Sequence, residues 1–148
     1  MAICPVSGIL RSIVEVQEWA RSEKGADGTR VIDRQWVQVH LARLLARAEF
    51  LKLLNWKVAW SADKGLSPAD ASATKVFGTE FALEAYRLLL EIVGRAGSLP
   101  EGSPGAVLQG RLEEGYRSQT IFTFGGGTNE VQRDIIAMVG LGLPRAPR

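Results

Sequence analysis

Apolar residues recur three and four positions apart along most of this chain, which is the spacing of one face of an α-helix. Residues 9–21 form the first such stretch, in which Ile13, Val16 and Ala20 are spaced in this way and Ile9 lies one turn earlier. No stretch shows the sustained apolar–polar alternation that indicates a half-buried β-strand. The pattern therefore predicts an all-α fold, with its first helix at residues 9–21.

A second, longer helix is predicted from Asp33, a favourable N-cap residue, to about Lys64, with Gly65 placed to end it. Its apolar stripe consists of Val37, Leu41, Leu44, Ala48 and Leu51. Further apolar residues extend beyond that face: Trp36, Phe50, Leu53, Leu54, Trp56 and Trp60. A helix that is apolar on several faces is usually buried among other helices. The tryptophans, including Trp19, are therefore expected in the core or at helix–helix contacts.

Ser67 and Pro68 mark the start of a third helix, because serine is a good cap and proline suits the first helical position. This helix is predicted to end near residue 93, before a loop rich in Gly, Pro and Ser at residues 94–105. A shorter helix is predicted from 107 to about 119, and Thr128 is placed to cap a last helix that ends near 139. Residues 1–8 and 141–148 are expected to be loose. Residues 1–148 thus form one domain, an up-and-down helical bundle.

The charges are balanced, since 18 Lys and Arg face 16 Asp and Glu for a net charge of +2, and the basic residues are scattered. This balance gives no reason to expect a nucleic-acid or membrane partner. The single cysteine, Cys4, excludes an internal disulfide and fits a reducing compartment, so a cytoplasmic location is expected. His40 has no nearby partner for a shared metal ion, and no metal site is predicted.

A glycine-rich segment, Gly125 to Gly127, stands directly before Thr128. Backbone N–H groups of such a turn before a helix can form an anion-binding nest. The same residues can instead form a tight turn that leads into a capped helix. There is no Lys after the last glycine and no strand before the first, so the segment is not a P-loop.

The run from Tyr116 to Arg133 is the most informative part of the chain. It reads Tyr-Arg-Ser-Gln-Thr-Ile-Phe-Thr-Phe-Gly-Gly-Gly-Thr-Asn-Glu-Val-Gln-Arg. It resembles the C-terminal signature of the flavin-dependent acyl-CoA dehydrogenases, in which Tyr-Arg-Asp-Ala-x-Ile leads into Tyr-Glu-Gly-Thr-Ser-Glu-Ile-Gln-Arg. The segment from Glu91 to Gly97 is similar to the Gln-Ile-Leu-Gly-Gly-x-Gly motif of that family. The resemblance covers nearly the whole chain but only the last third of a full-length member, which implies the C-terminal helical domain.

The resemblance implies that the full-length protein uses FAD to oxidise an acyl-CoA, on a fatty or a steroid substrate, between Cα and Cβ. Thr128 and Glu130 match positions that touch the adenosine part of FAD in relatives. Glu91 matches a Gln that meets the cofactor of the neighbouring subunit, and Gly94 is a matching glycine of the same motif, so both are candidate cofactor-binding residues. Because these domains form the core of the family's oligomers, the partner is expected to be a second copy or a related dehydrogenase subunit.

Gly126 stands where the catalytic Glu of the family is commonly found, and glycine cannot move a proton. In members that carry the base on the helix that opens the bundle, its position would fall before Met1. No catalytic residue is therefore predicted in this chain, which is expected to be inactive by itself. The nearby Glu113 and Glu114 match no base position.

Three further positions can be compared with the family, one at its diphosphate-binding residue and two at residues of its structural framework. Glu23 stands where relatives have an Arg that binds the flavin diphosphate, and Arg21 or Lys24 could take over that role. Arg117 and Arg133 match framework positions, and Arg133 is expected to pair with a carboxylate.

Three functions fit these residues. The first is the C-terminal domain of an FAD-dependent acyl-CoA dehydrogenase that supplies subunit-interface and FAD-adenosine contacts. The second is a non-catalytic subunit of a heteromeric acyl-CoA dehydrogenase that has lost its base. The third is a helical oligomerisation module without flavin.

Overall fold

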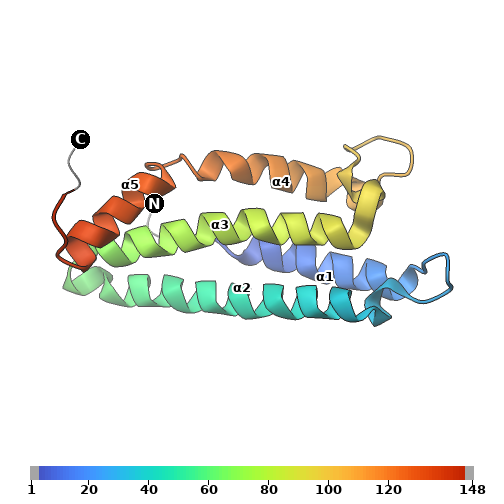
Figure 1. The fold of residues 1–148 in the computed structure, drawn as a ribbon, viewed down its shortest axis with the longest axis horizontal. Helices are drawn as coiled ribbons and strands as arrows, with labels where there is room; N and C mark the ends of the chain where they lie inside the picture. The colour runs from blue at the N-terminus through green and yellow to red at the C-terminus, as the bar shows by residue number, and fades with distance from the viewer. Residues whose placement is uncertain (1–3, 146–148) are drawn as a thin grey trace.

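The computed structural model describes residues 4–145, and in that range it contains helices and one isolated bridge between Lys24 and Arg30, but no strand. The all-α up-and-down bundle predicted from the sequence is confirmed (Figure 1). The five α-helices are α1 (Ser7–Ser22), α2 (Gln35–Ser61), α3 (Pro68–Val93), α4 (Arg111–Phe122) and α5 (Asn129–Ile135). Shorter helical segments lie between or after them: η1 (Val31–Asp33), η2 (Ala62–Lys64), η3 (Gly94–Ser98), η4 (Val107–Gly110) and, after α5, the π-helical η5 (Ile136–Gly140).

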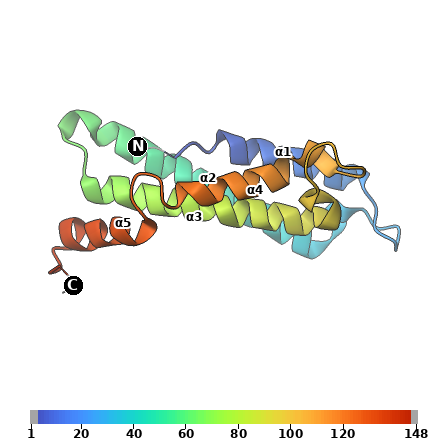
Figure 2. The same cartoon turned by 90° about the horizontal axis from the view of Figure 1, so that it is seen from above.

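Helix α3 is the centre of the bundle, because it contacts α1, α2, α4 and α5. Figure 1 shows α2 along one side of α3 and α4 along the other, and the view in Figure 2 shows α5 at the end where α3 begins. The buried core comes from all of the first four helices; its fully buried side chains include Ile13, Val16, Val37, Leu44, Leu51, Phe81, Leu89 and Leu112. The apolar stripe predicted for the long helix is buried as expected.

The start of α3 forms as the sequence predicts. Ser67 Oγ accepts a hydrogen bond from the Asp70 amide at 3.2 Å, and Pro68 occupies the first helical position. The cap satisfies one of the amide groups that a helix leaves unpaired at its start.

Replacing Ser67 with alanine is therefore expected to lower the free energy of unfolding by about 1 kcal/mol, the usual contribution of such a cap. Thermal or urea unfolding of the chain measures this change. The matched control is Ser103→Ala in the loop before α4, where the serine caps no helix and the change is expected to have little effect.

Two helix starts differ from the prediction. Helix α2 begins at Gln35 with Arg34 as its N-cap residue, so the predicted cap by Asp33 is wrong. The Asp33 carboxylate instead pairs with Arg30 at 2.7 Å within the preceding turn. The helix predicted from residue 107 begins as α4 only at Arg111, because the chain first makes a left-handed turn through Leu108 and Gln109, with φ of 52° and 56°.

The N-terminal segment is tied to the bundle over its described part. Helix α1 begins at Ser7, and the backbone of Cys4 exchanges two hydrogen bonds with the side chain of Asn55, at 3.0 Å and 2.8 Å. The prediction of loose termini also covers residues 1–3 and 146–148, which lie outside the described residues.

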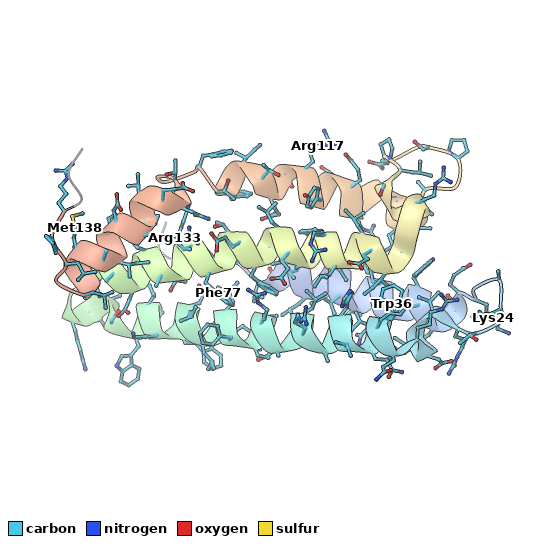
Figure 3. The ribbon with its side chains drawn as sticks, viewed as in Figure 1. Lys24, Trp36, Phe77, Arg117, Arg133 and Met138 are labelled. Atoms are coloured by element: carbon cyan, nitrogen blue, oxygen red, sulfur yellow. The ribbon has the colours of Figure 1, made fainter. Side chains whose placement is uncertain are left out.

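One face of α2 carries large apolar side chains that the chain itself does not cover. Trp56 and Trp60 are 65% and 78% exposed, and Trp36, Val39, Phe50 and Leu53 are also exposed. Figure 3 shows large side chains that project from α2 away from the rest of the bundle. The expectation that α2 is enclosed by other helices is therefore not met within this chain, whereas Trp19 packs against the core. Apolar surface of this extent is typical of an interaction face.

No helix in residues 4–145 has the length and apolar character that crossing a bilayer requires.

Candidate functional site

The glycine segment forms the tight turn that joins α4 to α5. Gly126 and Gly127 have φ of +74° and +99°, in the region that favours glycine. The amides of Gly125 and Gly127 donate within the turn, to the carbonyl groups of Ile121 and Phe124 at 3.2 Å and 3.1 Å. Since these two N–H groups are already used, the hydrogen bonds favour a tight turn over an anion-binding nest.

Gly126 adopts its conformation in open space, because a Cβ atom placed there would have no atom within 4 Å. The position could therefore hold a side chain, but only at the cost of a left-handed backbone. Because glycine adopts this conformation without strain, the backbone favours glycine at position 126, where members of the family that the sequence resembles commonly carry the catalytic Glu.

We expect Gly126→Ala to lower the free energy of unfolding by about 1 kcal/mol, the cost of a left-handed L-residue. Gly125→Ala is the matched control, since its Cβ would make only contacts of 3.8 Å or more and its φ is not positive. Urea unfolding of both variants measures the difference. Equal stability of the two would show that the turn relaxes to another conformation.

Thr128 caps α5 as predicted: its hydroxyl accepts a hydrogen bond from the Val131 amide at 3.4 Å. The carboxylate of Glu130 lies in the first turn of the helix. Its pKa is lowered by a hydrogen bond from its own backbone amide and by one from the Thr128 hydroxyl, so the group is ionised near neutral pH. Thr128 and Glu130, two of the predicted cofactor-binding residues, are thus brought together.

Lys75 of α3 binds the turn through hydrogen bonds, although it is not among the site residues predicted from the sequence. Lys75 is only 7% exposed. Its ammonium group donates to the carbonyl oxygens of Thr123 and Gly127, at 3.0 Å and 2.8 Å, and to Oδ1 of Asn129 at 2.7 Å. Burial lowers the pKa of Lys75, and the charges of Cys4, Glu130 and Glu80 oppose that effect.

Asn129 extends this contact into a buried network between α3 and α5. Its side chain is 5% exposed, and its Nδ2 donates to Thr79 Oγ1 and to Glu80 Oε1, both at 3.2 Å. Arg133 donates to the same Glu80 oxygen at 2.5 Å, which confirms that Arg133 pairs with a carboxylate.

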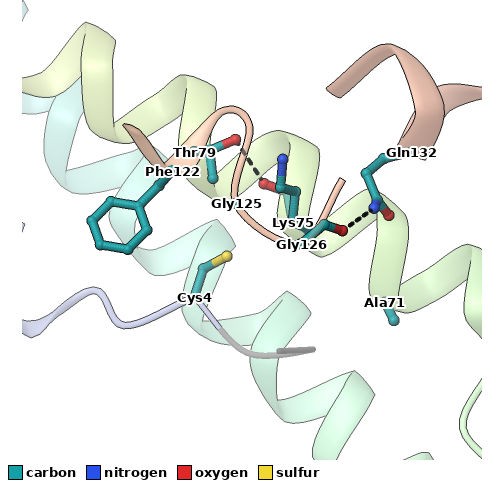
Figure 4. A pocket seen from close by; sticks show the side chains of 8 residues that line it. All are labelled: Cys4, Ala71, Lys75, Thr79, Phe122, Gly125, Gly126 and Gln132. Atoms are coloured by element: carbon teal, nitrogen blue, oxygen red, sulfur yellow. Dashed lines mark hydrogen bonds between the residues drawn. The ribbon is translucent and has the colours of Figure 1, made fainter. Parts of the chain in front are cut away.

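A cavity of about 340 Å³ lies beside the turn. Its lining comes from the N-terminal segment, α3, the end of α4, the turn and α5: Cys4, Ala71, Lys75, Thr79, Phe122, Gly125, Gly126 and Gln132 (Figure 4). Burial raises the pKa of the Cys4 thiol, and the nearby charge of Lys75 opposes this. The described residues that line the cavity include neither a carboxylate nor an imidazole, the side chains most often used as general bases.

The other two predicted cofactor-binding residues lie at the opposite end of α3. Twelve residues of helix separate Thr79, which touches Asn129, from Glu91, a distance of about 18 Å at 1.5 Å per residue. Glu91 Oε2 lies 3.6 Å from His40 Nε2 and 3.4 Å from Arg87. The four predicted residues therefore belong to two separate places within one chain.

The chemistry of these two places can be compared with what FAD would require. Ionised Glu130 and the Thr128 hydroxyl can accept hydrogen bonds from the ribose hydroxyls of an adenosine, whereas a carboxylate repels a diphosphate. At the other end, Gly94 has a φ of +74° and open space around its Cα, and Glu91 is again a carboxylate. Both places suit an adenosine or ribose contact, and neither suits the diphosphate itself.

Of the other residues singled out in the sequence, His40 lies beside Glu91, whereas Arg117, Glu113, Glu114 and Glu23 lie outside both places. Arg117 pairs with Glu113 at 3.0 Å one turn apart, and Glu114 is exposed on α4. Glu23, at the position of the diphosphate Arg in relatives, is exposed in the turn after α1. His40 has Glu91 as a neighbour, which the sequence did not reveal, but the described residues contain no group of three metal-ligating side chains.

The helical bundle and the motif around the glycine turn agree with the family that the sequence resembles. The family model described as "Acyl-CoA dehydrogenase, C-terminal domain" matches residues 1–141. The chain therefore belongs to the acyl-CoA dehydrogenase family and corresponds to its C-terminal domain.

Among known proteins, the chain is 62% identical to acyl-CoA dehydrogenase FadE26 of Mycobacterium tuberculosis, over 97% of this chain and 36% of the relative. Among solved structures, it is similar to a chain of the ChsE4–ChsE5 complex from Mycobacterium tuberculosis, with a TM-score of 0.91 and 60% identity, over 97% of this chain and 38% of the other. It is also similar to the Tcur3481–Tcur3483 steroid ACAD, with a TM-score of 0.85 and 42% identity, over 93% and 35%. The chain thus spans little more than a third of the length of these relatives.

Proposed function

We propose that this chain is the C-terminal domain of a subunit of an FAD-dependent acyl-CoA dehydrogenase that works in a complex with a second, related subunit. The substrate we propose is a steroid-derived acyl-CoA thioester, and the location we propose is the cytoplasm. Within the complex, the domain supplies subunit contacts and contacts to FAD, and the proton-accepting base comes from outside residues 1–148.

The observation that carries this proposal is the similarity to a chain of the ChsE4–ChsE5 complex, at 60% identity and a TM-score of 0.91. That complex is named for two different proteins, ChsE4 and ChsE5, which supports an assembly of two kinds of subunit over one of identical copies. The similarity to the Tcur3481–Tcur3483 steroid ACAD supports the substrate class. Gly126 supports a base located elsewhere, because the cavity beside it has no carboxylate among its described lining residues.

The exposed apolar face of α2 supports a role in subunit contacts. Trp56 and Trp60 on this face are of a residue type that often contributes most to association. For the cofactor, we propose that Thr128 and Glu130 contact the adenosine part of one FAD. Glu91, about 18 Å from Thr79 along α3, and Gly94, three residues further on, contact a different FAD held by the neighbouring subunit.

The test is to produce the full-length subunit alone, the related subunit alone, and both together, and to assay each with an electron acceptor. Steroid-derived and straight-chain acyl-CoA thioesters are compared as substrates. We expect turnover only from the pair, and faster turnover of the steroid-derived thioester. Full activity of the subunit alone would contradict the heteromer, and a preference for straight chains would contradict the substrate class.

The variant Gly126→Glu in the full-length pair tests the location of the base. We expect turnover that is unchanged or lower, because a second carboxylate next to an existing base crowds the site and position 126 has a left-handed backbone. A clear gain in turnover would show that the subunit had an otherwise complete site that lacked only this base. The 148-residue chain with the same substitution is expected to stay inactive, because a base acts only on a substrate that is already positioned.

A further inference from the structure

We propose that Lys75 is the positioning residue of the turn between α4 and α5, and that it fixes Thr128 and Glu130 in place for the cofactor. The cofactor part of this inference rests on the proposed function. The structural part rests on hydrogen bonds, burial and charge around one side chain.

The three donors of the Lys75 ammonium group match three acceptors at ordinary hydrogen-bond distances. These acceptors lie before, within and after the turn: the carbonyl oxygens of Thr123 and Gly127, and Oδ1 of Asn129. A lysine ammonium has three donors and no acceptor, so the group is fully used. One side chain of α3 therefore connects the end of α4, the glycine turn and the first residue of α5.

The position of Lys75 also explains why an ammonium is tolerated in a buried place. The Thr123 carbonyl that Lys75 binds belongs to the C-cap residue of α4, where the helix dipole places partial negative charge. A cation at the end of a helix is favourable for this reason. Without it, two carbonyl groups and the buried Asn129 side chain would lose a charged donor.

The residues beyond the turn depend on the same contact. Gly127 precedes Thr128 directly, and Asn129 stands between Thr128 and Glu130, so Lys75 holds the residues on both sides of the cap. A further hydrogen bond links the turn to α5, because the Gln132 side chain donates to the Gly126 carbonyl oxygen at 2.8 Å. The backbone conformation of Thr128 thus follows from the place of Lys75 on the rigid central helix.

The first experiment is backbone hydrogen exchange in the 148-residue chain with Lys75→Met, which keeps an unbranched side chain, one atom shorter, and removes the donors. The amides of Val131 and Gln132, which donate to Thr128, are expected to exchange about tenfold to a hundredfold faster. The amides of α2 are expected to keep their exchange rates. The matched control is Lys57→Met, which removes an equal charge from an exposed pair with Asp70 and is expected to change neither set.

A chemical rescue separates the ammonium from the packing of the side chain. In a Cys4→Ala background, Lys75→Cys is alkylated in the unfolded state with bromoethylamine, which restores an ammonium of nearly the same length. Alkylation with a propyl group gives the same length without charge. After refolding, we expect slow exchange at Val131 and Gln132 only with the ammonium. Equal protection in both products would overturn the proposal.

The second experiment measures the affinity of the full-length complex for FAD. Lys75→Met is expected to weaken FAD binding by about tenfold or more, the effect of losing one charged hydrogen-bonding group, and Lys57→Met is expected to leave it unchanged. The proposal is overturned if the turn exchanges as slowly in Lys75→Met as in the wild type. It is also overturned if α2 loses protection equally, or if exchange accelerates without any loss of FAD affinity.

These outcomes are distinguishable from failure of the proposed function. A wild-type complex that binds no FAD would refute the proposed function directly. The exchange measurements and the chemical rescue would then decide alone whether Lys75 positions the turn.

Discussion

A chain in which Trp56 and Trp60 are both replaced by glutamate is expected to lose its self-association. In the wild type, these side chains are 65% and 78% exposed and stand on one face of α2 with Phe50 and Leu53. An apolar face of this kind drives association because burying it removes apolar area from water. Tryptophans at the centre of an interface often contribute 2 kcal/mol or more each, so the double substitution is expected to weaken association at least about a hundredfold.

Sedimentation of the 148-residue chain at micromolar concentrations measures this effect. The wild type is expected to associate and the double variant to sediment as a monomer, with the same helical circular dichroism. Val14→Glu is the matched control, because it places a charge at an exposed apolar position of α1, away from the α2 face. A wild-type chain that is strictly monomeric and fully helical would contradict self-association through this face.

The substitution Gly115→Ala is expected to destabilise the chain by about 1–3 kcal/mol, although alanine favours a helix over glycine. Gly115 lies in α4 against Tyr86 of α3, and a Cβ atom there would overlap the ring of Tyr86. The Tyr86 side chain is buried, so the ring has little room to move. The expected result is a displacement of α4, the helix that leads into the glycine turn.

The matched control is Gly8→Ala in α1, where the new Cβ atom would meet nothing within 4 Å. This change is expected to stabilise the chain by about 0.5–1 kcal/mol, so the two substitutions should have opposite signs. Combining Gly115→Ala with Tyr86→Ala tests the cause. If the overlap with the ring is responsible, the double variant loses clearly less stability than the sum of the two single variants.

The helices of this protein could be predicted well because their signals are local. The period of apolar residues in α2, the Ser67–Pro68 start and the Thr128 cap each involve residues within one or two turns of each other, and the structure confirms them. The Asp33 cap failed for a local reason, because its carboxylate pairs with Arg30, but the late start of α4 depends on a tertiary contact. Leu108 packs against the core, and its left-handed turn delays the start of α4.

The candidate site was predictable only in part, because its pieces come from distant parts of the sequence. The family motif identified Thr128, Glu130, Glu91 and Gly94, but no local pattern indicated that they lie in two places. Lys75 was missed because a lysine in a helix is usually a solvated surface residue. A signal did exist, since Lys75 lies three or four positions from Ser72, Thr79 and Gly78, whose small or short side chains allow another segment to approach closely.

Native mass spectrometry of the full-length subunit, co-produced with the related subunit, tests most directly whether this domain belongs to one subunit of a flavin-containing heteromer. We predict one assembly whose mass contains both kinds of subunit together with FAD, and no FAD on the subunit produced alone. An assembly of this subunit alone that carries FAD on every copy would contradict the claim.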